Sequence, residues 1–337
     1  MCNSSLSLLN THAFSRDPAI EIVMGSIRVA RNAYSANRPF RFRTSVPANV
    51  EAAPMKCLWV LLTLSLIAMP ERTNASTAES SLASVSSAPC PAVAGVEALT
   101  QDTRKFVIVG EMHGTAEVPR LFGDLVCTFA KTQPVAIALE FSKTSTPALQ
   151  KYLASTGSDQ DRRELLKAPM WDKSLADGRS STAMLVLLDR LRQLRAAGMQ
   201  IRIYATQPDA GLTMDQHYYE LMMASEWVRI ASANANARVL VLVGNIHAKL
   251  RRPANLAFAP AATFLIETDT LSLDAESSGG SAWNCQKDGC GAHKLSGVVR
   301  KPAFVGLLLS STEGHNGTYS VGSPFTASPP AKSGIPD

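Results

Sequence analysis

The sequence has little of what membrane-spanning or nucleic-acid-binding proteins need. Its most apolar stretch, Leu58 to Met69, is 12 residues long, whereas a transmembrane helix needs about 20. Aromatic residues make up only 6% of the chain, and no basic stripe interleaved with aromatic residues is present. The G-x-S-x-G elbow of serine hydrolases is also missing. We therefore expect neither a nucleic-acid partner nor a stable membrane anchor in the mature protein.

The chain also has almost no excess positive charge when an N-terminal leader is left out of the count. The run "MKCLWVLLTLSLIAMPERTNASTA" starts at Met55 with one lysine, continues through the apolar stretch and reaches small residues near Ala75. This pattern is typical of a secretory signal peptide, here residues 55–75. Residues 1–75 hold 8 Lys and Arg against 4 Asp and Glu, and the rest of the chain holds 25 against 24. The mature protein is predicted to be nearly neutral.

The segment before the signal peptide, residues 1–54, has no clear periodicity and contains spaced arginines, among them Arg28, Arg31, Arg38, Arg41 and Arg43. Either translation starts downstream of Met1, or the segment is a genuine targeting extension. After the leader we expect a mobile Ser/Ala-rich lead-in (76–89), a single α/β domain (90–322) and a polar, Pro-rich tail (323–337). The expected location is the periplasm or the exterior.

Four cysteines remain in the exported part: Cys90, Cys127, Cys285 and Cys290. Exported cysteines usually form disulfides, and four of them allow three pairings. The short "CQKDGC" loop with its Asp-Gly turn favours a bridge between Cys285 and Cys290, which leaves Cys90 to pair with Cys127. The alternative is a metal site made by Cys285, Cys290 and His293, although no second pair supplies the usual zinc spacing.

Apolar runs alternate with helical patterns along the folded part, which predicts an α/β fold with a mixed, mainly parallel sheet flanked by helices. The predicted strands are "KFVIVG", "PVAIALEF", "QIRIYA", "RVLVLVG", "TFLIE" and "FVGLLLS". Helices are predicted after Thr115, which would cap the first one, after Ser180 and Ser181, and from Asp215 to about Ala231. Short helices are expected between residues 142 and 172.

Polar residues follow three of these strands where the strands end. Glu111 and His113 follow the first strand, Glu140 ends the second, and His247 follows the fourth. Carboxyl ends of parallel strands meet at one edge, where open α/β sheets bind their ligands. The four residues could form a general base with an orienting carboxylate, or a divalent-metal site of two histidines and carboxylates. The alternative is that each is an ordinary hydrogen-bonded residue at a strand end.

The paired motifs "VIVGEMHG" and "VLVGNIHA", each with Gly-x-x-His, together with Glu140, resemble the Tiki/TraB superfamily. That group includes erythromycin esterase-like enzymes and ChaN-like haem-binding lipoproteins. The resemblance covers about residues 104–268 and is strongest in "GEMHGTAEVP", "ALEF", "DGRSSTAM" and "GNIHA". It implies an EreA/ChaN-like fold and hydrolysis of a small-molecule or peptide substrate, by an esterase or metalloprotease mechanism. Binding of haem or another tetrapyrrole, without catalysis, is the second function that it implies.

One departure from the superfamily concerns a cation. Members similar to the erythromycin esterases carry an Arg-Asp pair, followed two residues later by Met-Ala, on the helix before the second motif, and here Tyr219 and Glu220 stand at those places. Arg179 could supply the missing guanidinium, oriented by Asp177, or it could form a salt bridge at a helix end. The expected substrate contacts are Asn245, Arg179, Asp177 and Glu220.

Two other functions are compatible with the sequence. His217 and Tyr218 lie at the start of the helix that begins near Asp215 and could bind haem, although a solvated histidine is the simpler interpretation. A structural envelope protein with a decayed site is a third class of function. The sequence leaves the substrate, the presence of a metal and the choice between hydrolysis and haem binding open.

Overall fold

The computed structural model describes residues 22–23, 26–27, 90–172, 177–209, 214–298, 306–309 and 314–332. The chain divides into two compact units, residues 1–83 and 84–337. In the first unit, β1 (Ile22–Val23) pairs antiparallel with β2 (Ser26–Ile27). The expected signal peptide and lead-in lie outside the described residues. Among the residues that are described, no helix is both long and apolar enough to cross a bilayer.

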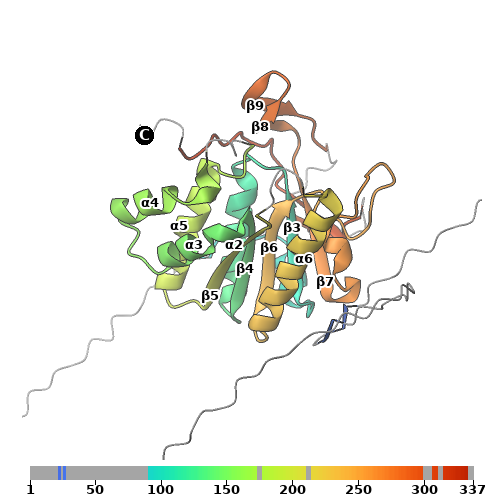
Figure 1. Cartoon of the computed structure of the whole chain (residues 1–337), viewed down its shortest axis with the longest axis horizontal. Coiled ribbons are helices and arrows are strands. Elements are labelled where there is room, and N and C mark those ends of the chain that lie inside the picture. The colour runs from blue at the N-terminus through green and yellow to red at the C-terminus, as the bar shows by residue number, and fades with distance from the viewer. Residues whose placement is uncertain are drawn as a thin grey trace, which may run out of the picture. The chain divides into compact units, whose positions relative to one another are not determined.

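The second unit is built on a seven-stranded sheet with the order β10-β11-β7-β3-β6-β4-β5 (Figure 1). All neighbouring strands are parallel except β10 and β11. The strands are β3 (Phe106–Glu111), β4 (Val135–Ser142), β5 (Ile201–Gln207), β6 (Arg238–Gly244), β7 (Thr270–Glu276), β10 (Gly306–Leu308) and β11 (Gly317–Ser320). This topology confirms the predicted mixed, mainly parallel α/β fold.

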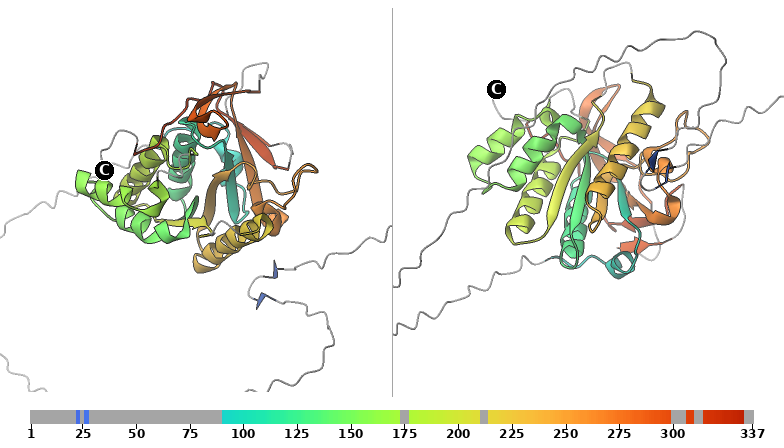
Figure 2. Two further views of the ribbon diagram at one scale, coloured as in Figure 1. Left: turned by 45° about the horizontal axis from the view of Figure 1, so that its top comes forward. Right: turned by 60° about the horizontal axis from the view of Figure 1, so that its bottom comes forward.

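Helices cover both faces of this sheet (Figure 2). One core contains residues of α2 (Glu117–Ala130), α3 (Thr146–Leu153), α4 (Asp159–Leu166) and α5 (Thr182–Ala196), together with Val107 and Leu139 from the strands. The other core contains residues of α6 (Gln216–Ala233) with Ile108 and Ala138. Successive strand residues thus enter opposite cores, as the two-residue period of a strand requires. A short helix, α1 (Val96–Thr100), precedes β3.

The helix starts differ in part from the prediction. Thr115 does not cap α2, which begins at Glu117; its hydroxyl instead donates to the carbonyl of Met112 at 3.1 Å. Ser181 does cap α5, because its Oγ accepts the backbone N–H of Met184. Ser180, its neighbour, donates to the carbonyl of Met170 instead.

The region before β7 is not a strand. The segment "TFLIE" was predicted to be one, but residues 261–269 form the two 3-10 helices η4 (Ala261–Phe264) and η5 (Glu267–Asp269). Pro260 stands at the start of η4, and the alternating "TLSLDAE" that follows forms β7. A hairpin of β8 (Gly280–Gln286) and β9 (Gly289–Leu295) is a further element that the sequence analysis did not identify.

The C-terminal segment is packed on the domain, in contrast to the predicted polar tail. Phe325 is buried. Ala116 and Thr182 donate their backbone N–H groups to the carbonyls of Thr326 and Pro329, and Ser328 donates to Gly114. These bonds explain the difference, because an extended, Pro-containing chain can use its remaining donors and acceptors to bind two loops. This C-terminal strap, residues 325–331, therefore joins the start of α2 to the start of α5.

The four cysteines lie in the two expected pairs. Cys90 and Cys127 are bridged with a Cα–Cα distance of 5.5 Å, and Cys285 and Cys290 with 3.9 Å. The second bridge links directly opposed positions of β8 and β9. With both thiols bridged, a metal site with His293 is ruled out, and the ring nitrogens of His293 instead contact Asn284 at 2.6 Å and Asp288 at 3.1 Å.

Candidate functional site

The order of three strands builds the candidate site. In the sheet, β6 lies between β3 and β4. Glu111 at the end of β3 and Glu140 near the end of β4 therefore flank Gly244, the last residue of β6. A Cβ atom on Gly244 would lie 2.9 Å from His113 Nε2 and 3.4 Å from Glu140 Oε2. The missing side chain is what allows His113 to reach across β6 to Glu140.

His113 lies between two buried carboxylates. Its Nδ1 is 3.0 Å from Glu111 Oε1 and its Nε2 is 3.2 Å from Glu140 Oε2. Burial disfavours the charged imidazolium, but the charge of Glu140 and the contacts with both glutamates outweigh burial and raise the pKa of His113 to about 10. At neutral pH, His113 is therefore a cation that directs both N–H groups at carboxylates.

Glu140 is the anion on which the cations converge. Its Oε2 accepts the backbone N–H of Gly244 at 2.7 Å. Its Oε1 lies 3.4 Å from Arg179 Nη1 and 3.6 Å from His247 Nε2. Burial opposes its charge, but His113, His247 and Arg179 together hold the pKa of Glu140 far below its usual range. Glu140 is thus a permanent carboxylate and a poor proton acceptor.

Arg179 reaches the site from the loop before α5. Asp177 holds it, with Oδ2 at 2.9 Å from Arg179 Nε and 2.5 Å from Nη2. Burial lowers the pKa of Arg179, and the contacts with Asp177 and Glu140 outweigh burial and raise it. The C-terminal strap supports this loop, because Ala331 donates its N–H to the carbonyl of Ser180. The 3.4 Å distance between Nη1 and Glu140 Oε1 places the guanidinium in the cluster around Glu140.

Tyr219 lies on α6 beside His247. The two ring centroids are 6.2 Å apart. Burial, assisted by the charge of Glu140, raises the pKa of Tyr219. Its hydroxyl therefore stays protonated at neutral pH and is a possible hydrogen-bond donor to an anion in the site.

The second histidine has its own carboxylate. His247 Nδ1 is 2.8 Å from Oε2 of Glu220 on α6. Glu220 is fully buried, and it accepts hydrogen bonds from Gln216 Nε2 at 2.7 Å and from the N–H of Ala261 at 2.9 Å. Burial opposes the imidazolium of His247, but Glu220 and Glu140 outweigh it and raise its pKa. Glu220, predicted as a substrate contact, lies behind His247 and orients it.

The two Gly-x-x-His motifs interlock. Asn245 donates its N–H to the carbonyl of Glu111 at 2.9 Å, which ties the second motif to the first. A Cβ on Gly110 would lie 2.9 Å from the Cα of Asn245. Each motif glycine thus makes room for the other motif, and Asn245 itself is partly exposed.

Two other predicted residues lie apart from this cluster, at the exposed start of α6. His217 packs edge-on against Phe264, with ring centroids 5.5 Å apart, and Tyr218 is 51% exposed. Asp215 caps the helix here, because its Oδ1 accepts the N–H groups of His217 and Tyr218 at 2.9 and 3.2 Å.

The donor set does not fit the divalent metal that the sequence suggested as one option. Glu111, His113, Glu140 and His247 were the possible ligands, but three of the four imidazole nitrogens contact carboxylates within 3.2 Å and the fourth faces Glu140. An imidazolium has no lone pair for a metal. Within the described ranges, no group of three or more His, Cys, Asp and Glu side chains has a metal-binding arrangement.

No protein-family model matches this chain, and no curated protein matches it. Solved structures do. A succinoglycan biosynthesis protein has a TM-score of 0.54 at 11% identity, covering 69% of this chain and 92% of that protein. An erythromycin esterase, EreC, gives 0.47 at 13%, with coverages of 62% and 81%. ChaN of Campylobacter jejuni, a haem-binding protein, gives 0.34 at 12%, with 53% and 84%. At such identities the similarity to the first protein concerns the fold alone.

Proposed function

We propose that this protein is an exported hydrolase in which His247 is the general base. The observation that carries the proposal is the Glu220–His247 pair, which faces a cluster of permanent cations across Glu140. Hydrolysis needs a proton acceptor and a stabilised anion, and this arrangement supplies both. The substrate would be a small-molecule ester or amide, or a peptide.

The base is assigned by hydrogen bonding. When His247 is neutral and Nδ1 donates to Glu220, Nε2 keeps its lone pair. Nε2 lies 3.6 Å from Glu140 Oε1, too far for a hydrogen bond, so a water molecule can compete for it. His113 is unsuited to this role because both its nitrogens contact carboxylates and its pKa is raised to about 10.

In the proposed reaction, Nε2 of His247 takes a proton from water while the water oxygen bonds to the substrate's carbonyl carbon. The carbonyl oxygen becomes an oxyanion, which the charges of His113 and Arg179 stabilise. The bond to the leaving group then breaks, and His247 returns its proton to that group. Glu220 holds the imidazole in one tautomer throughout, as a positioning residue.

Export is part of the proposal. The leader-like residues 55–75 support it, and so do the two disulfides, which persist in oxidising compartments. N-terminal sequencing of secreted or periplasmic protein should give a start close to Ala75. A mature chain that begins near Met1 would contradict both the signal peptide and the downstream start.

The test is hydrolysis of a panel of chromogenic esters, anilides and peptides by the full mature protein. His247→Ala should lower kcat/KM by about 10² to 10⁴ on any substrate that the wild type cleaves. His217→Ala is the matched control, because this histidine lies three residues from Glu220 on the exposed side of α6. Equal activity of wild type and His247→Ala would remove His247 as the base.

The pH profile separates positioning from a general loss of structure. The base must be neutral, so activity should rise as the pH rises through the pKa of His247. Glu220 raises that pKa, so Glu220→Gln should move the acid limb of kcat/KM to lower pH and also lower the plateau. A reduced plateau with an unmoved acid limb would show that Glu220 does not act on the charge of His247.

Haem binding is the second candidate, supported by the exposed His217 next to Phe264. Histidine and tyrosine side chains are common axial ligands of haem iron. Titration with haemin should then give a Soret band that His217→Ala weakens and His247→Ala leaves unchanged. The two histidine variants thus discriminate between the hydrolase and the haem binder.

A further inference from the structure

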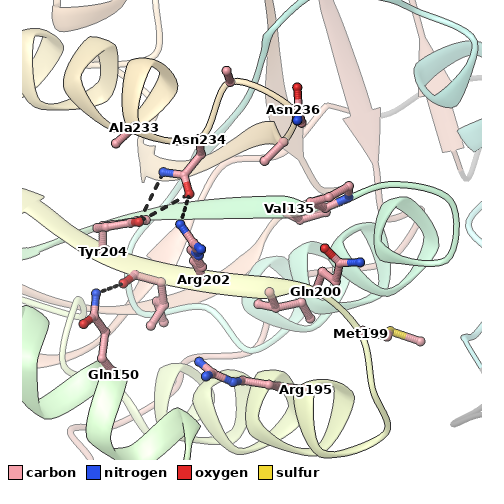
Figure 3. A pocket seen from close by; sticks show the side chains of 15 residues that line it. Val135, Gln150, Arg195, Met199, Gln200, Arg202, Tyr204, Ala233, Asn234 and Asn236 are labelled. Carbon is pink, nitrogen blue, oxygen red and sulfur yellow. Dashed lines mark hydrogen bonds between the residues drawn. The ribbon is translucent and has the colours of Figure 1, made fainter. Parts of the chain in front are cut away.

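A cavity lies at the opposite end of the sheet from the histidine site. It has a volume of about 810 Å³ and is lined at the amino ends of β4 and β5, near Val135 and Ile201, and at the end of α6 (Figure 3). The histidine site lies at the carboxyl ends of the strands, where Glu111 and Gly244 end β3 and β6. The volume is in the range of small-molecule sites, about 300 to 1,000 Å³.

The lining of this cavity is cationic and amide-rich. It contains the guanidinium groups of Arg195 and Arg202, and none of its 15 lining residues is Asp or Glu. In contrast, several arginines elsewhere pair with carboxylates, as Arg192 does with Asp189 and Arg229 with Glu226. Neither Arg195 nor Arg202 forms such a pair in the part of the chain that the structure describes. Figure 3 shows these two side chains on opposite sides of β5, Arg202 with Tyr204 and Asn234 and Arg195 with Gln150, so they line the cavity from two sides.

Arg202 is held in place from behind. Its Nη1 donates to Asn234 Oδ1 at 3.0 Å, and Asn234 Nδ2 donates to the carbonyl of Ile230 at 2.8 Å and to Tyr204 Oη at 3.2 Å. Figure 3 shows Tyr204, Arg202 and Asn234 joined in this way. A guanidinium has five N–H groups, so Arg202 keeps donors for a ligand while Asn234 fixes its orientation.

The partial negative charge at the C-terminal end of α6 does not repel an anion from this cavity. Carbonyl groups at a helix C-terminus carry partial negative charge, but Lys105 Nζ donates to the carbonyls of Asn234, Ala235 and Ala237 at 2.9, 2.8 and 2.6 Å. The nearest negative dipoles are thus paired with an ammonium group that is not part of the cavity lining.

We infer that this cavity binds a small polar anion, a molecule with a phosphate or carboxylate group and a hydroxylated body. The Arg202 guanidinium, which Asn234 orients, would bind the anionic oxygens in the bidentate manner that suits both groups, and the charge of Arg195 across β5 would add to the attraction. The amides of Gln150, Gln200 and Asn236 would bind the hydroxyls. This site is independent of the proposed hydrolase function.

The test is calorimetric titration of the full mature protein at low ionic strength with glucose 6-phosphate and glucuronate as anionic probes and glucose as the neutral probe. We expect the wild type to bind at least one anion and not glucose. Arg195→Gln with Arg202→Gln should weaken that binding by about tenfold or more, since charge-assisted hydrogen bonds are lost. Which anion binds more tightly tells phosphate from carboxylate.

A matched control removes the same charge elsewhere. Arg163 lies on α4 and Arg252 in the loop after the second motif, both outside the cavity lining, so Arg163→Gln with Arg252→Gln should bind the anion like the wild type. Hydrolysis by the His247 site should be unchanged in both double variants. Equal anion affinity of all three proteins, or no binding of either anion to the wild type, would overturn the inference.

Discussion

At the scale of single residues, His113 links the candidate site to the stability of the fold. Its pKa is about 10 in the folded protein and about 6.5 in an unfolded chain. A group whose pKa is raised on folding stabilises fully below its unfolded pKa, and that contribution is lost as the pH rises through the folded pKa. His113 should therefore stabilise the fold near pH 6 and contribute progressively less up to pH 10.

Urea unfolding at several pH values tests this prediction. The free energy of unfolding of the wild type should fall by on the order of a few kcal/mol more than that of His113→Asn between about pH 6 and 10. Asparagine keeps much of the size of histidine and does not titrate. Lysines and tyrosines titrate alike in both proteins, so the difference between the two pH curves reports the imidazole of His113 alone. Parallel curves would show that His113 carries no proton on which the fold depends.

Arg179 is a second residue with a separable role. The planar guanidinium of Arg179 binds Asp177 and at the same time directs Nη1 at Glu140. Lysine keeps the positive charge but cannot make both contacts in this way. On a substrate that the wild type cleaves, Arg179→Lys should lower kcat by about 10², the usual effect of losing one contact to a developing anion. Arg192→Lys is the control, because Arg192 is a partly buried arginine that also pairs with an aspartate, Asp189, but within α5 and not at Glu140. If both variants keep full activity, Arg179 is structural.

At the scale of elements, the prediction concerns the end of β6. Gly244 does not have a left-handed φ, so alanine fits its backbone. The added Cβ would meet His113 Nε2 at 2.9 Å, however, and displace the imidazole from Glu140. Gly244→Ala should fold, with a stability loss of about 1 to 3 kcal/mol, and lose hydrolytic activity by about 10² or more.

Gly291→Ala is the matched control for this substitution, because Gly291 also has an ordinary φ and its Cβ would meet nothing within 4 Å. Activity and circular dichroism of both variants decide the outcome. A fully active Gly244→Ala variant would show that contact between His113 and Glu140 across β6 is not required.

The elements also show which parts of the structure the sequence could predict. Apolar runs such as "KFVIVG" and "RVLVLVG" identify buried strands, and polar residues at their ends indicate the active edge. The insertion of β6 between β3 and β4 could not be predicted, because strand order depends on packing between distant segments. The same holds for Glu220, whose role behind His247 arises only when α6 packs beside β6 and η4.

Local composition misled the prediction in two places. The C-terminal strap has the Ser and Pro content of a loose tail, but its backbone bonds to loops more than a hundred residues earlier. The segment "TFLIE" has strand-like composition and becomes helical turns after Pro260. In both cases long-range hydrogen bonding or a local turn outweighed composition.

At the scale of the whole domain, the two disulfides should differ in their contribution to stability. The bridge between Cys90 and Cys127 joins residues 37 apart in the sequence and ties the start of the domain to α2, whereas Cys285 and Cys290 are 5 apart within one hairpin. A cross-link that closes a longer loop removes more entropy from the unfolded chain. On that account the long bridge contributes about 4 kcal/mol and the short one about 2 kcal/mol.

Paired alanine substitutions test this difference, with each pair serving as the control for the other. Urea unfolding should show that Cys90→Ala with Cys127→Ala destabilises the domain more than Cys285→Ala with Cys290→Ala. The gap should be wider than loop entropy alone gives, because Cys127 is fully buried among the residues of α2 and its loss also disturbs packing. Where the protein is folded, both variants should keep the hydrolytic activity of the His247 site, since neither bridge contacts it. A greater loss from the hairpin pair would mean that β8 and β9 hold the domain together more than the long bridge does.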